Sequence, residues 1–136
     1  MIKPINRDQK NLAIKAVPAT PADAQVVTDL LDTLAANSER CVGMAANMIG
    51  VNKAIIVVQM GPFAVPMQNP KIIAKSSSYE TQEGCLALDG ERNATRYQNI
   101  EVTFQDRNFK PQRQAFSGFI AQIIQHEMDH CAGIII

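Results

Sequence analysis

The sequence has no tryptophan, few aromatic residues and no long hydrophobic run. Phe, Tyr and Trp make up 5% of the 136 residues, which leaves few rings on which single-stranded nucleic acid could stack. No apolar stretch approaches the ~18 residues that a membrane-spanning helix needs, and the first residues lack the apolar segment of a secretion signal. We therefore expect a cytoplasmic protein that binds neither membranes nor nucleic acid directly.

An excess of charge of one sign is also missing. Thirteen basic residues balance thirteen acidic ones, so bulk attraction to polyanions is not expected. The three cysteines, Cys41, Cys85 and Cys131, are odd in number and far apart, unlike a disulfide framework. The apolar fraction of 46% suffices for a core, and the length fits one domain, which we expect to cover residues 1–136.

The hydrophobic pattern predicts helices towards both ends of the chain. Thr20 and Pro21 are typical of a helix start, and apolar residues at helical spacing predict a helix over about 21–37. A second apolar helix follows Ser117 as its N-cap and stops at Gly133. The first twenty residues are expected to be extended.

Strands are predicted between the two helices, from β-branched runs and alternating patterns, over 54–58, 71–74, 100–105 and 112–116. Residues 68–70 and 106–108 are predicted turns, and the serines at 76–78 a loop. Strands and helices do not alternate, so the prediction is an α+β fold with antiparallel sheet packed around one central helix.

The last helix contains the pattern His-Glu-x-x-His at residues 126–130. Two histidines four residues apart lie on one helical face, so both imidazoles can bind a single metal ion. Glu127 is rotated by about 100° from His126, where its carboxylate can take a proton from a metal-bound water without being a ligand. The alternative is a pair of buried, hydrogen-bonded structural histidines. His126 and His130 are the only histidines of the chain, and they lie on an otherwise apolar helix. Both observations favour the metal site.

A catalytic metal site needs three protein ligands and one open position. Cys131 points about 100° away from His130 and is better interpreted as a small buried residue. The third ligand must therefore come from upstream, where Cys41, Cys85 or a carboxylate can supply it. Cys85 has the better setting, because Gly84 before it permits a close approach of the backbone.

Three segments together resemble the motifs of the peptide deformylases, in the order of that family. Residues 41–48 are similar to Gly-x-Gly-x-Ala-Ala-x-Gln and residues 83–87 to Glu-Gly-Cys-Leu-Ser, while residues 125–130 match Gln-His-Glu-x-Asp-His in full. The resemblance extends from about Val26 to Gly133. It implies a metal-dependent hydrolase that removes the formyl group from the N-formylmethionine of new proteins.

The resemblance also implies roles for individual residues. Cys85, His126 and His130 correspond to the metal ligands, Glu127 to the general acid/base, and Leu86 to the residue whose backbone N–H stabilises the oxyanion. Ferrous iron is the expected metal, with zinc, nickel or cobalt as alternatives, because a thiolate and two imidazoles suit all four.

Substrate contacts follow from the same resemblance. The expected partners are N-formylmethionyl peptides and, in a weak and transient encounter, the ribosome. For Phe119 and Ile123 plain core packing is the alternative, and for Arg92 a surface salt bridge is preferred to a peptide contact. The expected substrate-binding residues are Val42, Gly43, Met44, Glu83, Phe119 and Ile123.

Four positions depart from the family pattern, namely Cys41, Asn47, Met48 and Ala87 in place of glycine, proline, glutamine and serine. The glutamine donates a hydrogen bond to the oxyanion or the metal-bound water, which a thioether cannot do, and losing such a donor typically costs ~10²–10³ in turnover. Two functions therefore stay open: a slower or differently tuned deformylase, and a metal-bound protein that binds peptide N-termini with little turnover. A small zincin-type peptidase is disfavoured, because no ligand follows His130.

Overall fold

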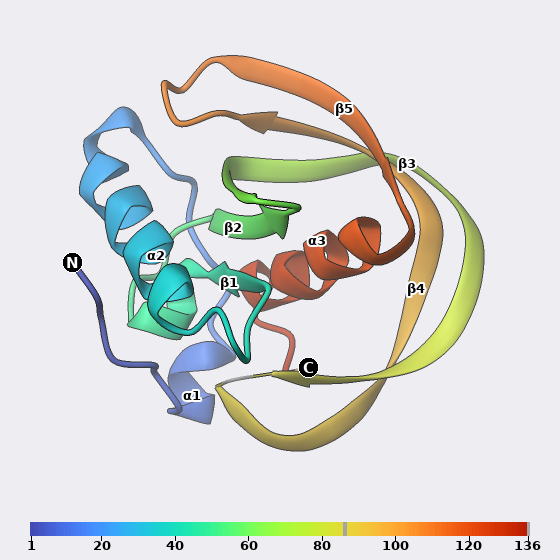
Figure 1. Ribbon diagram of the computed structural model, residues 1–136, viewed down its shortest axis with the longest axis horizontal. Helices are drawn as coiled ribbons and strands as arrows, with labels where there is room; N and C mark the ends of the chain where they lie inside the picture. The colour runs from blue at the N-terminus through green and yellow to red at the C-terminus, as the bar shows by residue number, and fades with distance from the viewer. Residues whose placement is uncertain (86, 136) are drawn as a thin grey trace.

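The computed structural model describes residues 1–85 and 87–135 and combines a five-stranded sheet with three α-helices (Figure 1). Two short 3₁₀ helices, η1 and η2, complete the described elements. In chain order the elements are α1 (Gln9–Leu12), η1 (Pro21–Asp23), α2 (Ala24–Ala36), β1 (Gly43–Ala45), η2 (Ala46–Ile49), β2 (Ile55–Met60), β3 (Phe63–Cys85), β4 (Leu88–Gln105), β5 (Pro111–Ser117) and α3 (Gly118–Cys131).

The sheet is antiparallel throughout and follows the chain order from β1 to β5. Strands β3 and β4 form a long hairpin that curves around α3, so the last helix lies inside the arch of the sheet (Figure 1). Helix α3 contacts β1, β2 and β4, while α2 contacts β1 and β2. The predicted α+β class, with antiparallel sheet around a central helix, is confirmed.

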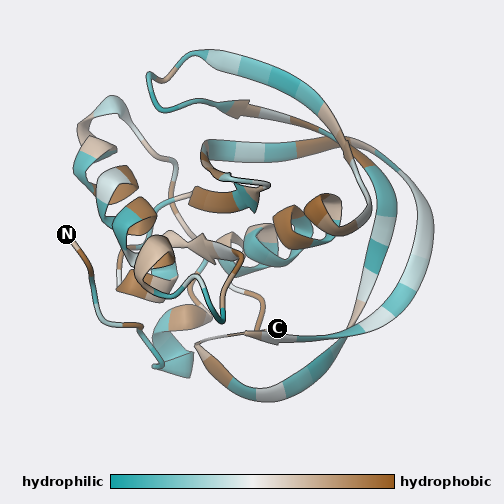
Figure 2. Ribbon diagram, in the orientation of Figure 1, coloured by the Kyte–Doolittle hydropathy of each residue, from teal (hydrophilic) through white to brown (hydrophobic). Residues whose placement is uncertain are grey.

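Strand β2 is buried on both faces, which explains its unbroken β-branched run. Ile55 and Val57 belong to the apolar cluster that contains Leu30 of α2, whereas Ile56 and Val58 belong to the cluster under α3. Alternate side chains of a strand point to opposite faces, so a strand between two helices needs apolar residues at every position. Figure 2 shows hydrophobic residues on β2 and on the N-terminal half of α3.

Both long helices lie where the sequence predicts them. Thr20 caps the first through a capping box with Asp23, and a turn of 3₁₀ helix precedes α2. Ser117 occupies the N-cap position of α3 but makes no side-chain cap hydrogen bond. Past the end of α3, Gly133 has a φ of 76°, the left-handed backbone that stops a helix.

Three local predictions were wrong. The first twenty residues are not all extended, because Asp8 caps the short helix α1. Residues 68–70 form a β-bulge within β3 and not a turn. Asn69 has a φ of 50° there, and its side-chain amide forms hydrogen bonds with Ala19 and Gln105. The serines at 76–78 continue β3. The turn after Gln105 and the strand before α3 are confirmed.

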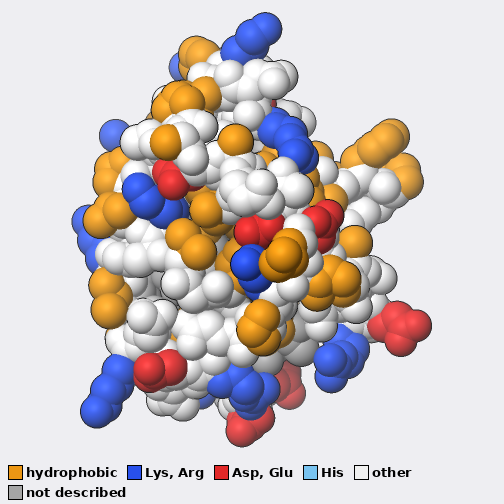
Figure 3. Space-filling view, turned by 90° about the vertical axis from the view of Figure 1, so that its left-hand side faces the viewer, with side chains coloured by type: hydrophobic (Ala, Val, Ile, Leu, Met, Phe, Trp, Pro, Cys, Tyr) orange, Lys and Arg blue, Asp and Glu red, His pale blue; other side chains and the backbone are white. Residues whose placement is uncertain are grey.

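The surface mixes charges of both signs. On the face that carries α2, acidic and basic side chains lie interspersed with apolar ones (Figure 3). Within the part of the chain that the structure describes, each helix is too short or too polar to span a bilayer.

Candidate functional site

Three side chains with metal-binding atoms converge beneath the sheet. His126 and His130 are buried on one face of α3, and the end of β3 brings Cys85 beside them. The two Nε2 atoms are 3.2 Å apart, and the Sγ of Cys85 lies 3.2 Å from Nε2 of His130. The three ligating atoms all lie within 4.8 Å of one another. A thiol and two imidazoles directed at one point are the donor set of a transition-metal site.

A buried carboxylate orients the first histidine. Oε1 of Glu83 lies 2.8 Å from Nδ1 of His126, which leaves Nε2 of the ring directed at Cys85 and His130. Gln122 donates to the other oxygen of Glu83 at 2.9 Å. Such an outer hydrogen bond fixes the tautomer and orientation of a metal-binding histidine. The Glu83 carboxylate is therefore already occupied by protein groups, although the residue lines the cavity described below.

Arg96 completes this buried network, and the sequence analysis missed it. Its guanidinium contacts Glu83 at 2.7 Å and Asp129 at 2.8 Å, with the arginine and Glu83 both buried. Burial opposes the charge of Glu83, but hydrogen bonds from His126, Arg96 and Gln122 outweigh it and lower the pKa of Glu83 to about 2. One signal was available: Arg96 shares the inward face of β4 with Ala94 and Ile100, and a charge there requires a buried counter-charge.

Glu127 lies beside the three converging atoms with one oxygen unused. The side chain is 5% exposed, and its Oε1 has no hydrogen-bond partner among the described residues. Burial raises the pKa of Glu127 to about 7. A carboxyl that changes its charge near neutral pH and lacks a partner is poised to exchange protons with a ligand.

The pKa values of the two histidines shift in opposite directions, although burial lowers both. Burial lowers the pKa of His130 to about 3, so this ring is neutral, as a metal ligand must be. At His126 burial also works against the charge, but Cys85 and Glu83 outweigh it and raise the pKa to about 10.

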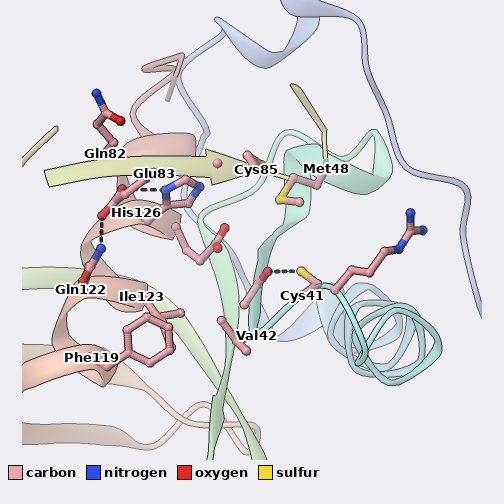
Figure 4. Close-up of a pocket in the computed structure, with 14 residues that line it drawn as sticks. Cys41, Val42, Met48, Gln82, Glu83, Cys85, Phe119, Gln122, Ile123 and His126 are labelled. Carbon is pink, nitrogen blue, oxygen red and sulfur yellow. Dashed lines mark hydrogen bonds and ion pairs between the residues drawn. The ribbon is translucent and has the colours of Figure 1, made fainter. Parts of the chain in front are cut away.

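A cavity of about 260 Å³ opens onto these groups (Figure 4). Its walls come from the segment before and within β1, from η2, from the end of β3 and from one side of α3. The lining residues are Arg40, Cys41, Val42, Gly43, Met48, Gln82, Glu83, Gly84, Cys85, Phe119, Gln122, Ile123, His126 and Glu127.

Gly43 permits the close approach of β1 and α3. A Cβ atom at this position would lie 2.6 Å from Cγ2 of Ile123 and 3.0 Å from Oε2 of Glu127. Any larger residue would push the helix away, so the glycine is what lets the Glu127 carboxylate lie against the strand. Phe119 lies at the mouth of the cavity and is 64% exposed, so it is not a core residue.

Four other described residues that the sequence singled out do not line the cavity. Met44 and Ala87 are both buried in the apolar cluster that contains Leu30 of α2. Asn47 donates from its side-chain amide to the carbonyl of His130 at 2.8 Å. Arg92 donates to the backbone carbonyl of Asp89. Leu86 lies outside the described residues.

Of the four departures from the family pattern, Cys41 and Met48 line the cavity. Met48 is 1% exposed, and its Sδ accepts a hydrogen bond from the backbone N–H of Ala45. Cys131 lies outside the cavity; burial raises the pKa of its thiol to about 12.

Known proteins are similar to this chain along nearly its whole length. The polypeptide deformylase family matches residues 2–136. The chain is 57% identical to a peptide deformylase of Clostridium beijerinckii over 136 residues, which is 100% of each chain. It is 40% identical to a peptide deformylase of Pelotomaculum thermopropionicum over 119 residues, which cover 85% of this chain and 76% of that relative.

Solved structures with the same fold are also peptide deformylases. A crystal structure from Legionella pneumophila is 29% identical, with a TM-score of 0.89 over 99% of this chain and 83% of its own. A structure from Acinetobacter baumannii bound to Met-Ala-Ser is 26% identical, with a TM-score of 0.89 over 99% of this chain and 97% of its own. The relatives are metal-dependent hydrolases that remove formyl groups, and the chain belongs to the polypeptide deformylase family.

Proposed function

We propose that this protein hydrolyses the formyl group of N-formylmethionyl peptides with one divalent metal ion held by Cys85, His126 and His130. The observation that carries the proposal is the convergence of these three donor atoms within 4.8 Å, beside a buried carboxyl with an unused oxygen. The donor set suits ferrous iron, which we take as the first expectation, and equally zinc, nickel or cobalt. When bound, the metal supplies a Lewis acid that lowers the pKa of a coordinated water.

Glu127 is the residue that moves the proton in this proposal. Its carboxylate accepts the proton of the attacking water and hands it to the amine that leaves with the peptide. Because burial raises its pKa to about 7, the group can both take and return a proton near neutral pH. Glu83 does not react and instead holds the ring of His126.

The cavity accounts for the substrate in the same proposal. Val42 lines the cavity, and the backbone of Gly43 pairs with an extended peptide in this proposal. Phe119 and Ile123 border the space for the methionine side chain. The backbone N–H of Leu86 is proposed as an oxyanion donor from the family resemblance. The site of action is then the cytoplasm, where formylated chains emerge from the ribosome, in an encounter that we propose to be weak and transient.

A metal-bound protein that binds peptide N-termini with little turnover is the second candidate. Met48 favours it, because its sulfur lines the cavity and cannot donate a hydrogen bond to the oxyanion. Glu127 favours the enzyme, because a pure binder has no use for a buried acid beside the metal.

Metal content and turnover together test the proposal. Cys85→Ser and His130→Ala should each lose bound metal, whereas Cys131→Ser, the matched control, should retain it. Glu127→Gln should keep the metal and lose at least about a hundredfold in turnover of formyl-Met-Ala-Ser. Metal retained in Cys85→Ser would overturn the ligand assignment, and wild-type turnover no faster than that of metal-free protein would favour the second candidate.

A further inference from the structure

Strand β1 presents a free backbone edge to the cavity. Among the described strands it pairs with β2 alone, at one end of the sheet order. The N–H of Gln59 in β2 donates to the carbonyl of Val42 at 2.8 Å, so this carbonyl points towards β2. Successive residues of a strand direct their backbone groups to opposite sides, and the carbonyl of Gly43 therefore points to the free edge.

Two sulfur atoms occupy this edge. The thiol of Cys41 donates to the carbonyl of Gly43 at 2.8 Å, and the N–H of Ala45, two residues further on the same edge, donates to Sδ of Met48 at 3.5 Å. Figure 4 shows the Cys41 thiol directed back to this carbonyl, on the side of the cavity opposite His126. Burial raises the pKa of Cys41 to about 11, so the thiol keeps its proton at neutral pH.

The buried acid next to this edge points to a ligand. Gly43 packs so tightly against Glu127 that a Cβ atom would lie 3.0 Å from Oε2, and the other oxygen of that carboxyl has no partner among the described residues. A strand edge that no second described strand covers and a buried acid with an unpartnered oxygen thus meet in one cavity. An extended peptide chain can pair with the edge of β1 while its reacting end lies at the Glu127 carboxyl.

We propose that the Cys41 thiol competes with the bound peptide for the carbonyl of Gly43 and thereby sets the peptide affinity of this protein. A peptide N–H can pair with that oxygen only after the thiol rotates away, so each binding event breaks one internal hydrogen bond. The inference rests on the proposed function, in which a peptide N-terminus is the ligand. Cys41 is a positioning residue here: it touches the group that holds the peptide and takes no part in the chemistry.

Peptide affinity measures the competition directly. The tripeptide Met-Ala-Ser, titrated calorimetrically into zinc-loaded protein, should bind about three- to tenfold more tightly to Cys41→Ala than to the wild type, because a neutral hydrogen bond contributes roughly 0.5–1.5 kcal/mol. Cys41→Ser keeps a donor and should stay within about twofold of the wild type. Cys131→Ala is the matched control, a cysteine outside the cavity whose removal should leave the affinity unchanged.

A spectroscopic test reads the thiol itself and does not depend on a destabilising variant. In zinc-loaded Cys131→Ala, Cys41 is the one cysteine left with a proton, because Cys85 binds a metal as thiolate. Its infrared S–H stretch should shift to higher frequency when saturating Met-Ala-Ser displaces it from the carbonyl. An unchanged band with bound peptide would overturn the proposal, and so would an affinity that does not rise in Cys41→Ala.

These results separate the inference from the function on which it rests. Tighter Met-Ala-Ser binding to Cys41→Ala and a shifted S–H band, without turnover of formyl-Met-Ala-Ser, would support the proposed competition and refute the proposed enzyme activity. Turnover of formyl-Met-Ala-Ser with an unshifted S–H band would support the enzyme activity and refute the competition by Cys41.

Discussion

Met48 occupies the position at which the family pattern has a glutamine, and its sulfur is already engaged with the N–H of Ala45. A glutamine has a similar length and an amide that both accepts and donates. It could accept from Ala45 through Oε1 and direct Nε2 into the cavity. The thioether can only accept, so in the proposed reaction the oxyanion would lack one donor.

Replacing this sulfur should therefore restore a donor. Met48→Gln is expected to raise kcat for formyl-Met-Ala-Ser by roughly a hundredfold, the usual effect of one oxyanion-hole donor. Met48→Leu, which has a similar volume and no donor, should show no such gain. Steady-state kinetics on metal-loaded protein distinguishes the two, and equal rates in both variants would mean that the missing donor does not limit turnover.

Arg96 pairs with the buried Glu83, which orients His126, and with the half-buried Asp129. Arg96→Met should lower the free energy of unfolding by about 3–5 kcal/mol, because it leaves Glu83 buried without its counter-charge. Metal affinity should fall by about 10- to 100-fold, since the support of His126 is loosened. Urea unfolding and a metal-competition titration check the two effects.

A surface pair provides the matched control for that arginine. Arg113, which pairs with Glu101, is largely exposed. Its replacement by methionine should cost less than about 1 kcal/mol and leave metal affinity unchanged. Similar losses in both variants would show that the buried network has no special role.

Sequence reasoning located His126, Glu127 and His130 because helical geometry relates residues four apart without knowledge of the fold. Helical spacing could not identify the partners of Arg96, although its place on one face of β4 with Ala94 and Ile100 marks a buried charge. Its contact with Glu83 depends on how the β3–β4 hairpin closes over α3, and no short spacing encodes that approach.

At the scale of elements, the β4–β5 connection shows how one carboxylate can organise a turn. Asp106 accepts hydrogen bonds from the backbone N–H groups of Asn108 and Lys110 and from the side chain of Gln112. The backbone hydrogen bond from Lys110 contributes most to lowering the pKa of Asp106. Phe109 has a φ of 62° in the same turn, so side-chain hydrogen bonding offsets an unfavourable backbone.

This lowered pKa gives the turn a defined pH dependence. Because the pKa is lower in the folded than in the unfolded chain, the Asp106 carboxylate stabilises the fold above the ordinary carboxyl range near ~3.9. The contribution is lost as the pH falls through that range to the folded pKa. Asp106→Asn should therefore be less stable than the wild type at neutral pH, and the difference should shrink in acid. Thermal unfolding at both pH values measures it; a difference that grows in acid would contradict the assignment.

Helices were predicted better than strands for a physical reason. Helix α2 and helix α3 each bury one stripe, which leaves a 3.6-residue period in the sequence. Most side chains between Ile73 and Gln82 in β3 are exposed, so no alternation marks the strand. Ser77 and Asn69 look like turn residues, yet they bend a continuous strand.

At the scale of the whole molecule, the segment around residues 13–16 meets the C-terminal end of α3. The N–H of Ala16 donates to the carbonyl of Cys131 at 2.8 Å, and a Cβ atom on Gly133 would lie 2.5 Å from the carbonyl oxygen of Ala13. The helix that carries the two histidines is thus anchored by the N-terminal segment.

Two glycine substitutions can separate this anchoring from backbone strain. Gly133 and Gly61 both have positive φ, but a Cβ on Gly61 meets nothing within 4 Å. Gly61→Ala should cost about 1–2 kcal/mol from the left-handed backbone alone, and Gly133→Ala should cost about 1–3 kcal/mol more from the clash. Chemical denaturation of the two variants gives the difference, and equal losses would argue against a tight contact with Ala13.

The position of Cys85 at the tip of the β3–β4 hairpin has a mechanical consequence. It lies 45 residues before His130 in sequence, yet the two side chains touch. A metal ion held between them would act as a removable cross-link that closes a long loop, with an entropic effect of about 4 kcal/mol if the loop behaves as in a disulfide. The ion proposed for the chemistry would then also link the tip of the β3–β4 hairpin to α3. A chelator would remove this cross-link together with the catalytic metal.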